Sequence, residues 1–339
     1  MKKLLFIITS IFILFLAACA NESTTNEEAT TDKESDSQYP IVIKHAFGET
    51  TIEEKPERVA TVAWANHDVV LALGVVPVGF SAANYGIQDD SGLLPWTADK
   101  LKELGEDNPT VYQDTDGLDF EAIADSNPDV ILAAYSGITE EEYDTLSQIA
   151  PVVPYEETPW VTPWRDQVLL NAKGMGMEEE GKKLVADTEK LIADKANEYS
   201  SIKGKKAAFG MFNTADLSSF YIYTPADPRG EFLSDLGMEY PEGIKELITD
   251  DSFYIQVSAE NADALNDTEL FITYGNKDTL AALQADPILG KVPAIAAGNV
   301  VVIEDNTPLA AAGNPNPLSI QYTIDEYLTL ISDVTKNIK

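Results

Sequence analysis

The stretch EEEGKKLVADTEKLIADKANEYSS, residues 178–201, sets the frame for the rest of the chain. Its apolar residues, among them Leu184, Leu191 and Ile192, recur at three- and four-residue spacing between charged flanks, the pattern of an amphipathic helix. Such a helix would be roughly 35 Å long, about the width of a small domain. Segments typical of alternating strands and helices precede and follow it. We therefore expect two Rossmann-like α/β lobes joined by a single long helix.

The two lobes are expected over residues 39–177 and 203–339, with the joining helix over residues 178–202. In the first lobe the pattern predicts a hairpin over 41–53, then strands over 59–63, 78–80 and 130–134, and an irregular stretch over 81–109. It predicts helices over 66–73, 119–125 and 139–149, and one more that ends around residues 174–176. In the second it predicts strands over 206–211, 220–223, 270–273 and 300–303, and helices over 231–236, 279–284 and 318–335. Alternation of strands and helices favours parallel strand pairing.

The two halves contain an imperfect internal echo. Glu121 opens a predicted short helix, a strand follows, and Tyr135 comes fourteen positions after Glu121. Glu260, a second short helix, a strand and Tyr274 repeat this order with the same spacing. Two α/β lobes can share such spacings by chance, but the echo favours lobes of related topology.

The N-terminus has the pattern of an export signal. Lys2 and Lys3 precede the apolar run 4–16, which is too short to span a bilayer comfortably, and Leu16-Ala17-Ala18-Cys19 resembles a bacterial lipobox. We expect a lipoprotein signal peptide over residues 1–18, a lipid on Cys19, and a disordered polar tether over residues 19–38. The protein would then be anchored to the outer face of the cell membrane. A transmembrane anchor, or a secretory signal with a chance cysteine, is the alternative.

Composition excludes some functions. The chain carries 57 acidic against 23 basic side chains, a formal charge of −34, whereas nucleic-acid binding needs clustered Lys and Arg. Cys19 is the only cysteine, so no internal disulfide can form. We therefore expect no nucleic-acid partner.

Catalytic motifs are missing from the sequence. It contains no G-x-S-x-G, G-x-x-x-x-G-K-[ST] or G-x-G-x-x-G pattern. A transition-metal site usually recruits several His or Cys, and the chain has two histidines, His45 and His67. We expect no catalytic residue, no metal ligand and no cofactor, and assign His67 to the start of the first helix or to a pocket wall.

Aromatic residues near predicted strand ends form the first candidate binding group. In parallel α/β sheets, ligands lie outside the carboxyl ends of the strands. Any one of these aromatics could be structural, but several in both halves favour a shared cleft for a bulky ligand. The candidates are Trp64, Tyr135 and Tyr274 after strands, and Tyr85, Trp96 and Trp160 in loops.

Arginine is scarce in this chain. Of the three, Arg58 precedes a strand and is assigned a structural role, whereas Arg165 and Arg229 lie near helix starts. A planar guanidinium suits carboxylate or catecholate oxygens, so an anionic ligand would need such local charge. Surface placement without function is the alternative for either Arg165 or Arg229.

The chain resembles the substrate-binding lipoproteins of iron-siderophore ABC importers, of the ferric-hydroxamate, ferric-enterobactin and cobalamin binding class. The resemblance covers residues 39–339 and rests on the order and spacing of several short segments. These are Lys55-Pro56-Glu57-Arg58-Val59, Asp119-Phe120-Glu121-Ala122-Ile123-Ala124, Asn127-Pro128-Asp129-Val130-Ile131-Leu132, Ile149-Ala150-Pro151-Val152, Phe232-Leu233-Ser234-Asp235-Leu236-Gly237, Val257-Ser258-Ala259-Glu260 and Asp286-Pro287-Ile288-Leu289.

The resemblance implies a fold of the class III periplasmic-binding-protein type with little hinge motion. It implies that Glu121 and Glu260 meet arginines on the two permease subunits. It also implies a ferric ion that stays wrapped in its chelator while aromatic faces and Arg or Tyr donors hold the complex. The stretches 221–225 and 93–96 look closest to ferric-enterobactin binders, yet such trianionic ligands usually meet more basic residues.

We therefore expect a monomeric extracytoplasmic receptor that delivers a ferric siderophore to an ABC permease, a heterodimer or homodimer, with its ATPase. The siderophore subclass stays open, and the same scaffold carrying haem or cobalamin is an alternative. An exported hydrolase using Ser136 or His67 is an alternative of another class. An adhesive protein is a further one, although it would not need the matched Glu121 and Glu260.

Overall fold

The computed structural model describes residues 38–114 and 116–338 of the 339-residue chain. The expected signal peptide, Cys19 and all of the expected tether except Gln38 therefore lie outside the described residues. Within the described part, no helix has both the length and the apolar character that a membrane span needs.

The first lobe is built on a parallel five-stranded sheet preceded by a hairpin of β1 (Ile41–His45) and β2 (Gly48–Ile52). The strands of the sheet are β3 (Val59–Thr61), β4 (Gly79–Ser81), β5 (Val111–Tyr112), β6 (Val130–Ala133) and β7 (Val152–Pro154), in the order β5-β4-β3-β6-β7. The helices are α1 (Asn66–Ala72), α2 (Pro95–Glu103), α3 (Phe120–Asp125), α4 (Glu140–Leu146) and α5 (Trp164–Gly174). Strands β3, β4, β6 and β7 are buried along their whole length, as expected when both faces of a parallel sheet are covered.

The second lobe repeats this strand order in a mixed sheet. Its strands are β8 (Ala207–Met211), β9 (Ser219–Tyr223), β10 (Tyr254–Ser258), β11 (Leu270–Gly275) and β12 (Val300–Glu304), in the order β10-β9-β8-β11-β12. The α-helices are α7 (Pro228–Asp235), α8 (Glu242–Lys245), α9 (Thr279–Ala285), α10 (Pro293–Ala297), α11 (Pro308–Ala311) and α12 (Pro317–Thr335). Two 3₁₀ helices are η1 (Ala259–Leu265) and η2 (Leu289–Lys291). The matching strand orders agree with the internal echo.

Strand direction is where the second lobe departs from the expected parallel pairing. β9 is antiparallel to both β8 and β10. The connection from β8 to β9 contains no helix, and a parallel pair needs a longer crossover. β8, β11 and β12 are parallel to one another, as predicted.

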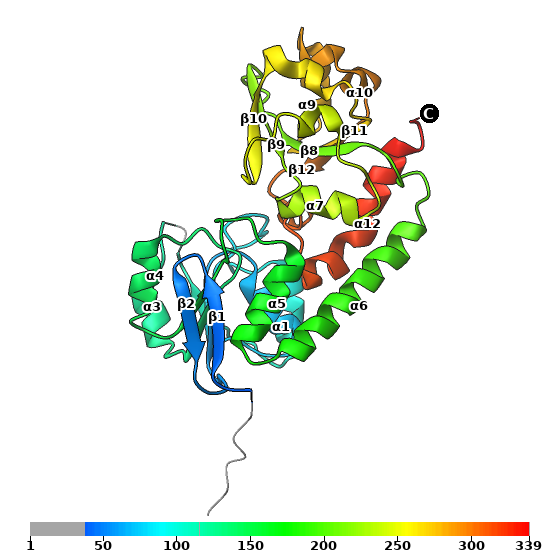
Figure 1. Ribbon diagram of the computed structural model, residues 1–339. Coiled ribbons are helices and arrows are strands. Elements are labelled where there is room, and N and C mark those ends of the chain that lie inside the picture. The colour runs from blue at the N-terminus through cyan, green and yellow to red at the C-terminus, as the bar shows by residue number, and fades with distance from the viewer. Residues whose placement is uncertain (1–37, 115, 339) are drawn as a thin grey trace, which may run out of the picture. The chain divides into compact units, whose positions relative to one another are not determined.

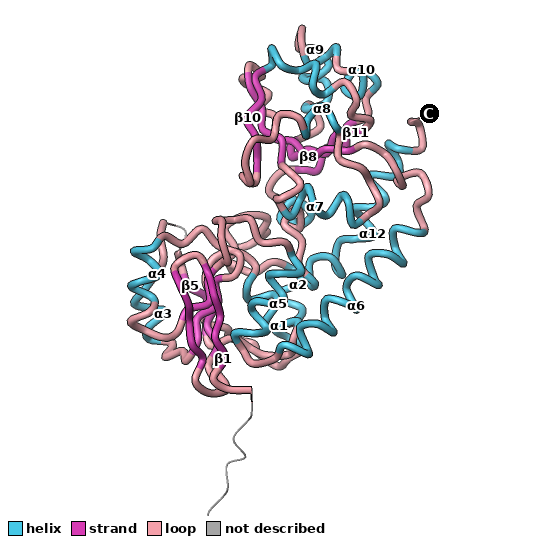
Figure 2. The backbone as a smooth tube through the Cα atoms, in the orientation of Figure 1, coloured by secondary structure: helices cyan, strands magenta, loops and turns pink. Residues whose placement is uncertain are grey.

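The sequence patterns missed several short elements (Figure 2). The stretch 81–109 was predicted to be irregular, but Pro95 begins a helix that runs to Glu103, with proline in the first turn where its missing N–H costs nothing. β5 and β7 have only two and three residues, too few for a periodic signal.

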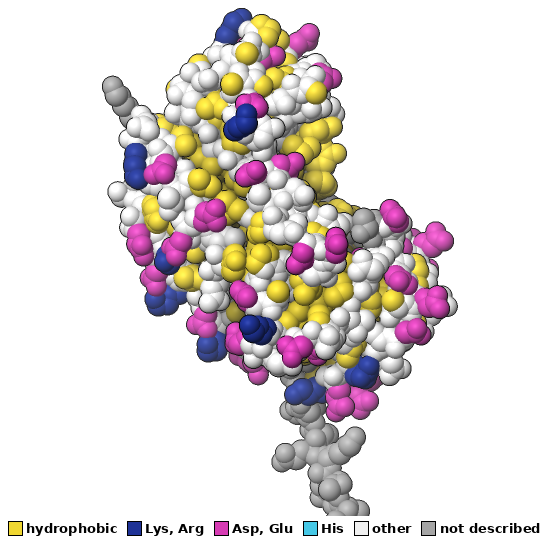
Figure 3. All heavy atoms as spheres, turned by 180° about the vertical axis from the view of Figure 1, so that it is seen from behind, with side chains coloured by type: hydrophobic (Ala, Val, Ile, Leu, Met, Phe, Trp, Pro, Cys, Tyr) yellow, Lys and Arg dark blue, Asp and Glu magenta, His cyan; other side chains and the backbone are white. Residues whose placement is uncertain are grey.

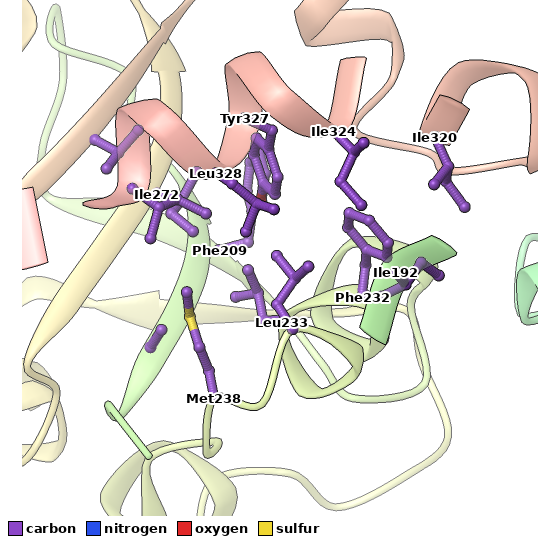
Figure 4. Packing of buried hydrophobic residues seen from close by; sticks show 14 of the residues in the cluster. Ile192, Phe209, Phe232, Leu233, Met238, Ile272, Ile320, Ile324, Tyr327 and Leu328 are labelled. Atoms are coloured by element: carbon purple, nitrogen blue, oxygen red, sulfur yellow. The ribbon is translucent and has the colours of Figure 1, made fainter. Parts of the chain in front are cut away.

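The predicted long helix is confirmed as α6 (Glu178–Asn197), although it ends before the expected residue 202, and α12 packs beside it. Asn316, the N-cap of α12, donates a hydrogen bond from Nδ2 to Asp68 in the first lobe at 2.9 Å. Further along, Ile324 and Leu328 pack in one cluster with residues of the second sheet, α7 and α6 (Figure 4). α12 therefore contacts both lobes.

An apolar core continues from one lobe into the other. Val69, Trp164 and Val168 of the first lobe belong to the same buried cluster as Ile192 of α6 and Phe209 of the second sheet. Moving one lobe against the other would expose apolar surface of this close-packed core to water. The free-energy cost is about 25 cal/mol for each Å² exposed. The lobes are thus joined by packing as well as by the chain.

Candidate ligand-binding site

A cavity of about 880 Å³ lies at the carboxyl ends of the strands and is lined by both lobes. Its size is in the range of small-molecule sites. The first lobe contributes residues that follow β3, β4 and β6, and the second contributes residues at the ends of β8, β11 and β12. Of the predicted ligand contacts, those that line it are Trp64, Tyr85, Tyr135, Trp160, Arg229 and Tyr274.

Backbone geometry at the exit of β3 holds Trp64 toward the cavity. Its neighbours Ala63 and Ala65 have φ of 62° and 59°, in the left-handed region that costs on the order of 1–3 kcal/mol for a residue other than glycine. Hydrogen bonds fix this turn. Ala63 N–H donates to Ser81 Oγ at 2.8 Å, and Asn66 Nδ2 donates to the backbone oxygens of Val62 and Tyr135.

Trp160 and Tyr135 form one wall of the cavity. Their rings meet edge to face with centroids 5.3 Å apart, and the backbone N–H of Trp160 donates to the backbone carbonyl of Ser136 at 2.9 Å. A Cβ at position 137 would collide with the indole of Trp160, so Gly137 leaves space for this ring. The wall is thus set by local backbone as well as by ring packing.

Several polar contacts cross the cavity between the lobes. Tyr135 Oη donates to Asn314 Oδ1 at 3.1 Å, and Tyr85 Oη donates to Asp305 Oδ1. The rings of Tyr85 and Tyr274 meet edge to face with centroids 6.2 Å apart. These contacts bring residues more than a hundred positions apart in sequence into one site.

Arg229 lies in the first turn of α7, is largely buried, and pairs with Asp227, the N-cap of the same helix. Its Nε and Nη2 donate to the two carboxylate oxygens of Asp227 at 2.7 and 2.6 Å, and its guanidinium lies 3.8 Å from the ring centroid of Tyr223. Burial alone would lower the pKa of Arg229, but the Asp227 carboxylate outweighs it and raises that pKa. Burial also raises the pKa of Tyr135 and Tyr274, so both remain O–H donors at neutral pH.

The lining is not positively charged. It includes the carboxyl groups of Asp114, Glu142 and Asp305, whereas Arg229 is the single basic side chain among the lining residues and is already paired. A highly anionic ligand would therefore meet like charge on entry.

The structure places Trp96 outside the cavity, which corrects its prediction as a ligand contact. Trp96 is buried, and its Nε1 donates to Asp68 at 2.7 Å, alongside Thr97 Oγ1 at the same distance. A buried carboxylate requires such donors, so Trp96 is a structural partner of Asp68. His67 also lies outside the lining and stacks on Phe80 with ring centroids 4.7 Å apart.

Arg165 also lies outside the cavity, because its guanidinium forms ion pairs with carboxylates of two other helices. It pairs with both oxygens of Asp235 in α7 at 2.9 Å and with Glu189 in α6 at 2.6 Å. Arg165 is the second residue of α5, so this cluster joins the first lobe, the long helix and the second lobe. Its predicted role in ligand binding is thus replaced by one in lobe packing.

Glu231, in the same cluster, is expected to make stability depend on pH. Burial and the nearby carboxylates of Asp235 and Asp166 raise its pKa from 4.5 to about 7, against the opposing charge of Arg165. Between pH 4.5 and about 7 the Glu231 carboxyl is therefore protonated in the folded protein and ionised in the unfolded chain. The contribution of Glu231 to the free energy of unfolding falls as pH rises through this range. We expect Glu231→Gln to raise the free energy of unfolding by on the order of 1–3 kcal/mol at high pH and hardly at all at low pH.

Urea unfolding of wild type and variant on either side of this range measures the effect. Glu180→Gln, at an exposed position of α6, is the matched control and should leave the free energy of unfolding within about 0.5 kcal/mol of wild type. Equal differences from wild type at both pH values for Glu231→Gln would contradict the expected titration.

Glu121 and Glu260 occupy corresponding positions on the two lobes. Glu121 lies in the first turn of α3, which precedes β6, and Glu260 in the first turn of η1, which precedes β11. Both side chains are exposed, and neither carboxylate has an ion pair with another described residue. Asp119 and Ser258 provide the N-terminal caps of the two helices, so the glutamates are not needed for capping.

Some lining residues were not predicted. Tyr223 is the last residue of β9, Phe253 lies directly before the edge strand β10, and Met211 is the last residue of β8. Tyr223 lies in a predicted strand, and a residue's face in a strand is visible only once its neighbours are known. Among the residues that the structure describes, no group of three or more His, Cys, Asp or Glu side chains could hold a metal ion.

The profile of the periplasmic binding protein family matches residues 59–307, and the chain belongs to this family. The fold is similar to that of PiaA from Streptococcus pneumoniae TIGR4 in complex with ferrichrome, with a TM-score of 0.86 and 55% identity over 88% of this chain and 100% of that one. The probable siderophore-binding lipoprotein YfiY of Bacillus subtilis (strain 168) is 26% identical, covering 79% of this chain and 78% of that protein. The ferric enterobactin-binding periplasmic protein FepB of Escherichia coli O6:H1 (strain CFT073) is 28% identical, covering 76% and 81%.

Proposed function

We propose that this protein is the substrate-binding component of an ABC importer and captures a ferric siderophore in the cavity between its lobes. The observation that carries the proposal is the aromatic cavity in a chain that is similar, over 88% of its length, to PiaA, which was crystallised with ferrichrome. The protein carries out no reaction in this role. It holds the complex and releases it to the permease.

The charge of the lining favours a ferric hydroxamate as the cargo. A ferric trihydroxamate complex is neutral, whereas a ferric tricatecholate is trianionic. Two like charges about 6 Å apart repel by about 3 kcal/mol at an effective dielectric constant of about 20. With Asp114, Glu142 and Asp305 in the lining and Arg229 paired with Asp227, the neutral complex is the one that the cavity accepts at least cost.

The lining residues divide into two roles in this proposal. The rings of Trp64 and Trp160 supply broad apolar faces for the organic part of the chelator. The hydroxyls of Tyr135 and Tyr274 and the guanidinium of Arg229 are the donors available for hydroxamate oxygens. The ferric ion stays bound to its chelator throughout.

Location and partners follow from the same proposal. The N-terminal signal supports a lipid on Cys19 and a position outside the cytoplasmic membrane. The exposed Glu121 and Glu260 are assigned to contact the two permease subunits, with the receptor acting as a monomer.

A titration panel tests the function. We expect ferrichrome to quench tryptophan fluorescence at low ligand concentration and a ferric tricatecholate to bind at least about a hundredfold more weakly, which corresponds to about 3 kcal/mol. Haem and cyanocobalamin form two further arms of the panel, and iron-free chelator is the control. Binding of haem or cobalamin alone, or no response to any ferric siderophore, would contradict the proposal.

A further inference from the structure

The second sheet carries a surface of one methionine and two tyrosines that starts at the rim of the cavity and extends away from it; we call it the outer shelf: Met211, Tyr221 and Tyr254. Met211 is paired with Tyr221 across β8 and β9, and Tyr254 is paired with Tyr223 across β9 and β10. Paired residues share a face of the sheet, as do residues two apart in a strand. The outer shelf therefore lies on the same face as Tyr223, which lines the cavity.

The outer shelf is continuous with the cavity. Met211 lines the cavity and is 42% exposed, and Phe253, another lining residue, has its ring centroid 4.6 Å from that of Tyr254. Tyr254 is 39% exposed and meets the ring of Tyr221 edge to face at 5.1 Å. Figure 3, seen from behind, shows hydrophobic side chains gathered at the edge of the second lobe where β10 lies, next to the junction with the first lobe.

Packing of the protein itself does not account for this surface. None of the three residues belongs to the buried clusters on either face of the second sheet. The neighbouring side chains on the same face of the sheet, Ser219 and Gln256, are polar but uncharged. Exposed aromatic groups beside a binding cavity are typical of an interaction site.

Resting on the proposed function, we propose that the outer shelf is a second contact for the ligand. It holds an apolar or aromatic group that a siderophore carries outside its iron-binding core. The cavity encloses the chelated iron, and the shelf begins where the lining reaches solvent at Met211. Its uncharged, ring-rich surface selects for aryl or acyl substituents and offers nothing to charged ones. Such a contact, burying on the order of 60 Å² of apolar surface, raises affinity about tenfold.

The test compares two neutral ferric hydroxamates with the same iron-binding core. They are ferrichrome and a ferrichrome derivative with a naphthyl group attached to its peptide ring, titrated into the full-length protein in detergent. We expect the derivative to bind wild type about tenfold more tightly than ferrichrome. The double variant Tyr221→Ser/Tyr254→Ser should lose this advantage and bind ferrichrome within twofold of wild type.

Tyr322→Ser is the matched control, because Tyr322 is 53% exposed on α12 and does not line the cavity. It should leave both affinities unchanged. Equal binding of both ligands to wild type, or an equal loss of both in the double variant, would overturn the proposal. Reduced uptake with both affinities intact would also overturn it, and would assign the shelf to the permease. Failure of wild type to bind either ligand would instead count against the proposed function.

Discussion

Replacing Asp227 by alanine is expected to lower the free energy of unfolding by about 3–5 kcal/mol. The Asp227 carboxylate is fully buried and neutralises Arg229 through two hydrogen bonds. It also caps α7 by accepting the backbone N–H of Arg229 at 2.8 Å. Without it, a buried guanidinium has lost its counter-charge and a helix has lost its cap, which alone costs about 1 kcal/mol. Urea denaturation followed by circular dichroism measures the change.

Two further variants separate these effects. Asp227→Asn keeps an oxygen acceptor for the cap but removes the charge, so a large loss there identifies the ion pair as the main term. Asp216→Ala is the matched control, because Asp216 accepts a similar turn hydrogen bond, from Ser218 N–H at 3.0 Å, on an exposed loop of the same lobe. A loss below about 1 kcal/mol for Asp227→Ala would show that the pair is not needed for the fold.

The double variant Glu121→Ala/Glu260→Ala is expected to reduce siderophore-dependent iron uptake at least tenfold while leaving ligand affinity unchanged. Both carboxylates are exposed on corresponding helices and lie outside the cavity. Removing two charged contacts worth about 1–2 kcal/mol each at an interface is enough for such an effect. Uptake of radiolabelled iron by cells, beside titration of the purified protein, measures the two quantities.

Glu140→Ala/Glu246→Ala is the matched control, since both side chains are exposed glutamates in or beside short helices, one in each lobe. It should support normal uptake. If the Glu121/Glu260 variant lost ligand affinity in parallel with uptake, these residues would serve the cavity or the fold, and their assignment to docking would be wrong.

Periodicity and strand ends account for the parts of the fold that were predicted correctly. α6 and α12 carry apolar stripes long enough to be recognised, and β6 is a continuous run of buried apolar residues. The antiparallel direction of β9 was not predicted, because it depends on a helix being absent from the preceding connection. β10 was missed because it lies at the sheet edge with mostly exposed residues.

The site shows the same division between local and long-range information. Trp64, Tyr135 and Tyr274 line the cavity because they follow strands, and strand ends gather at one edge of a sheet. Trp96 and Arg165 were misassigned because their partners, Asp68 and Asp235, are distant in sequence. A polar or aromatic residue is therefore a sound candidate for a pocket wall only when its hydrogen-bond donor is not already paired with a carboxylate elsewhere in the fold.

The path of α12 limits how this protein can be recombined with its relatives. The helix starts against the first lobe, where its N-cap bonds to Asp68, and then packs into the core of the second. In a chimera joined at α6, the second lobe and α12 would come from one parent and the first lobe from the other. α12 would then have to pack against a first lobe with a different sequence. Working chimeras should therefore carry Asp68 and Asn316 from the same parent. We therefore expect that the two lobes are inherited together in evolution and are not exchanged separately between relatives.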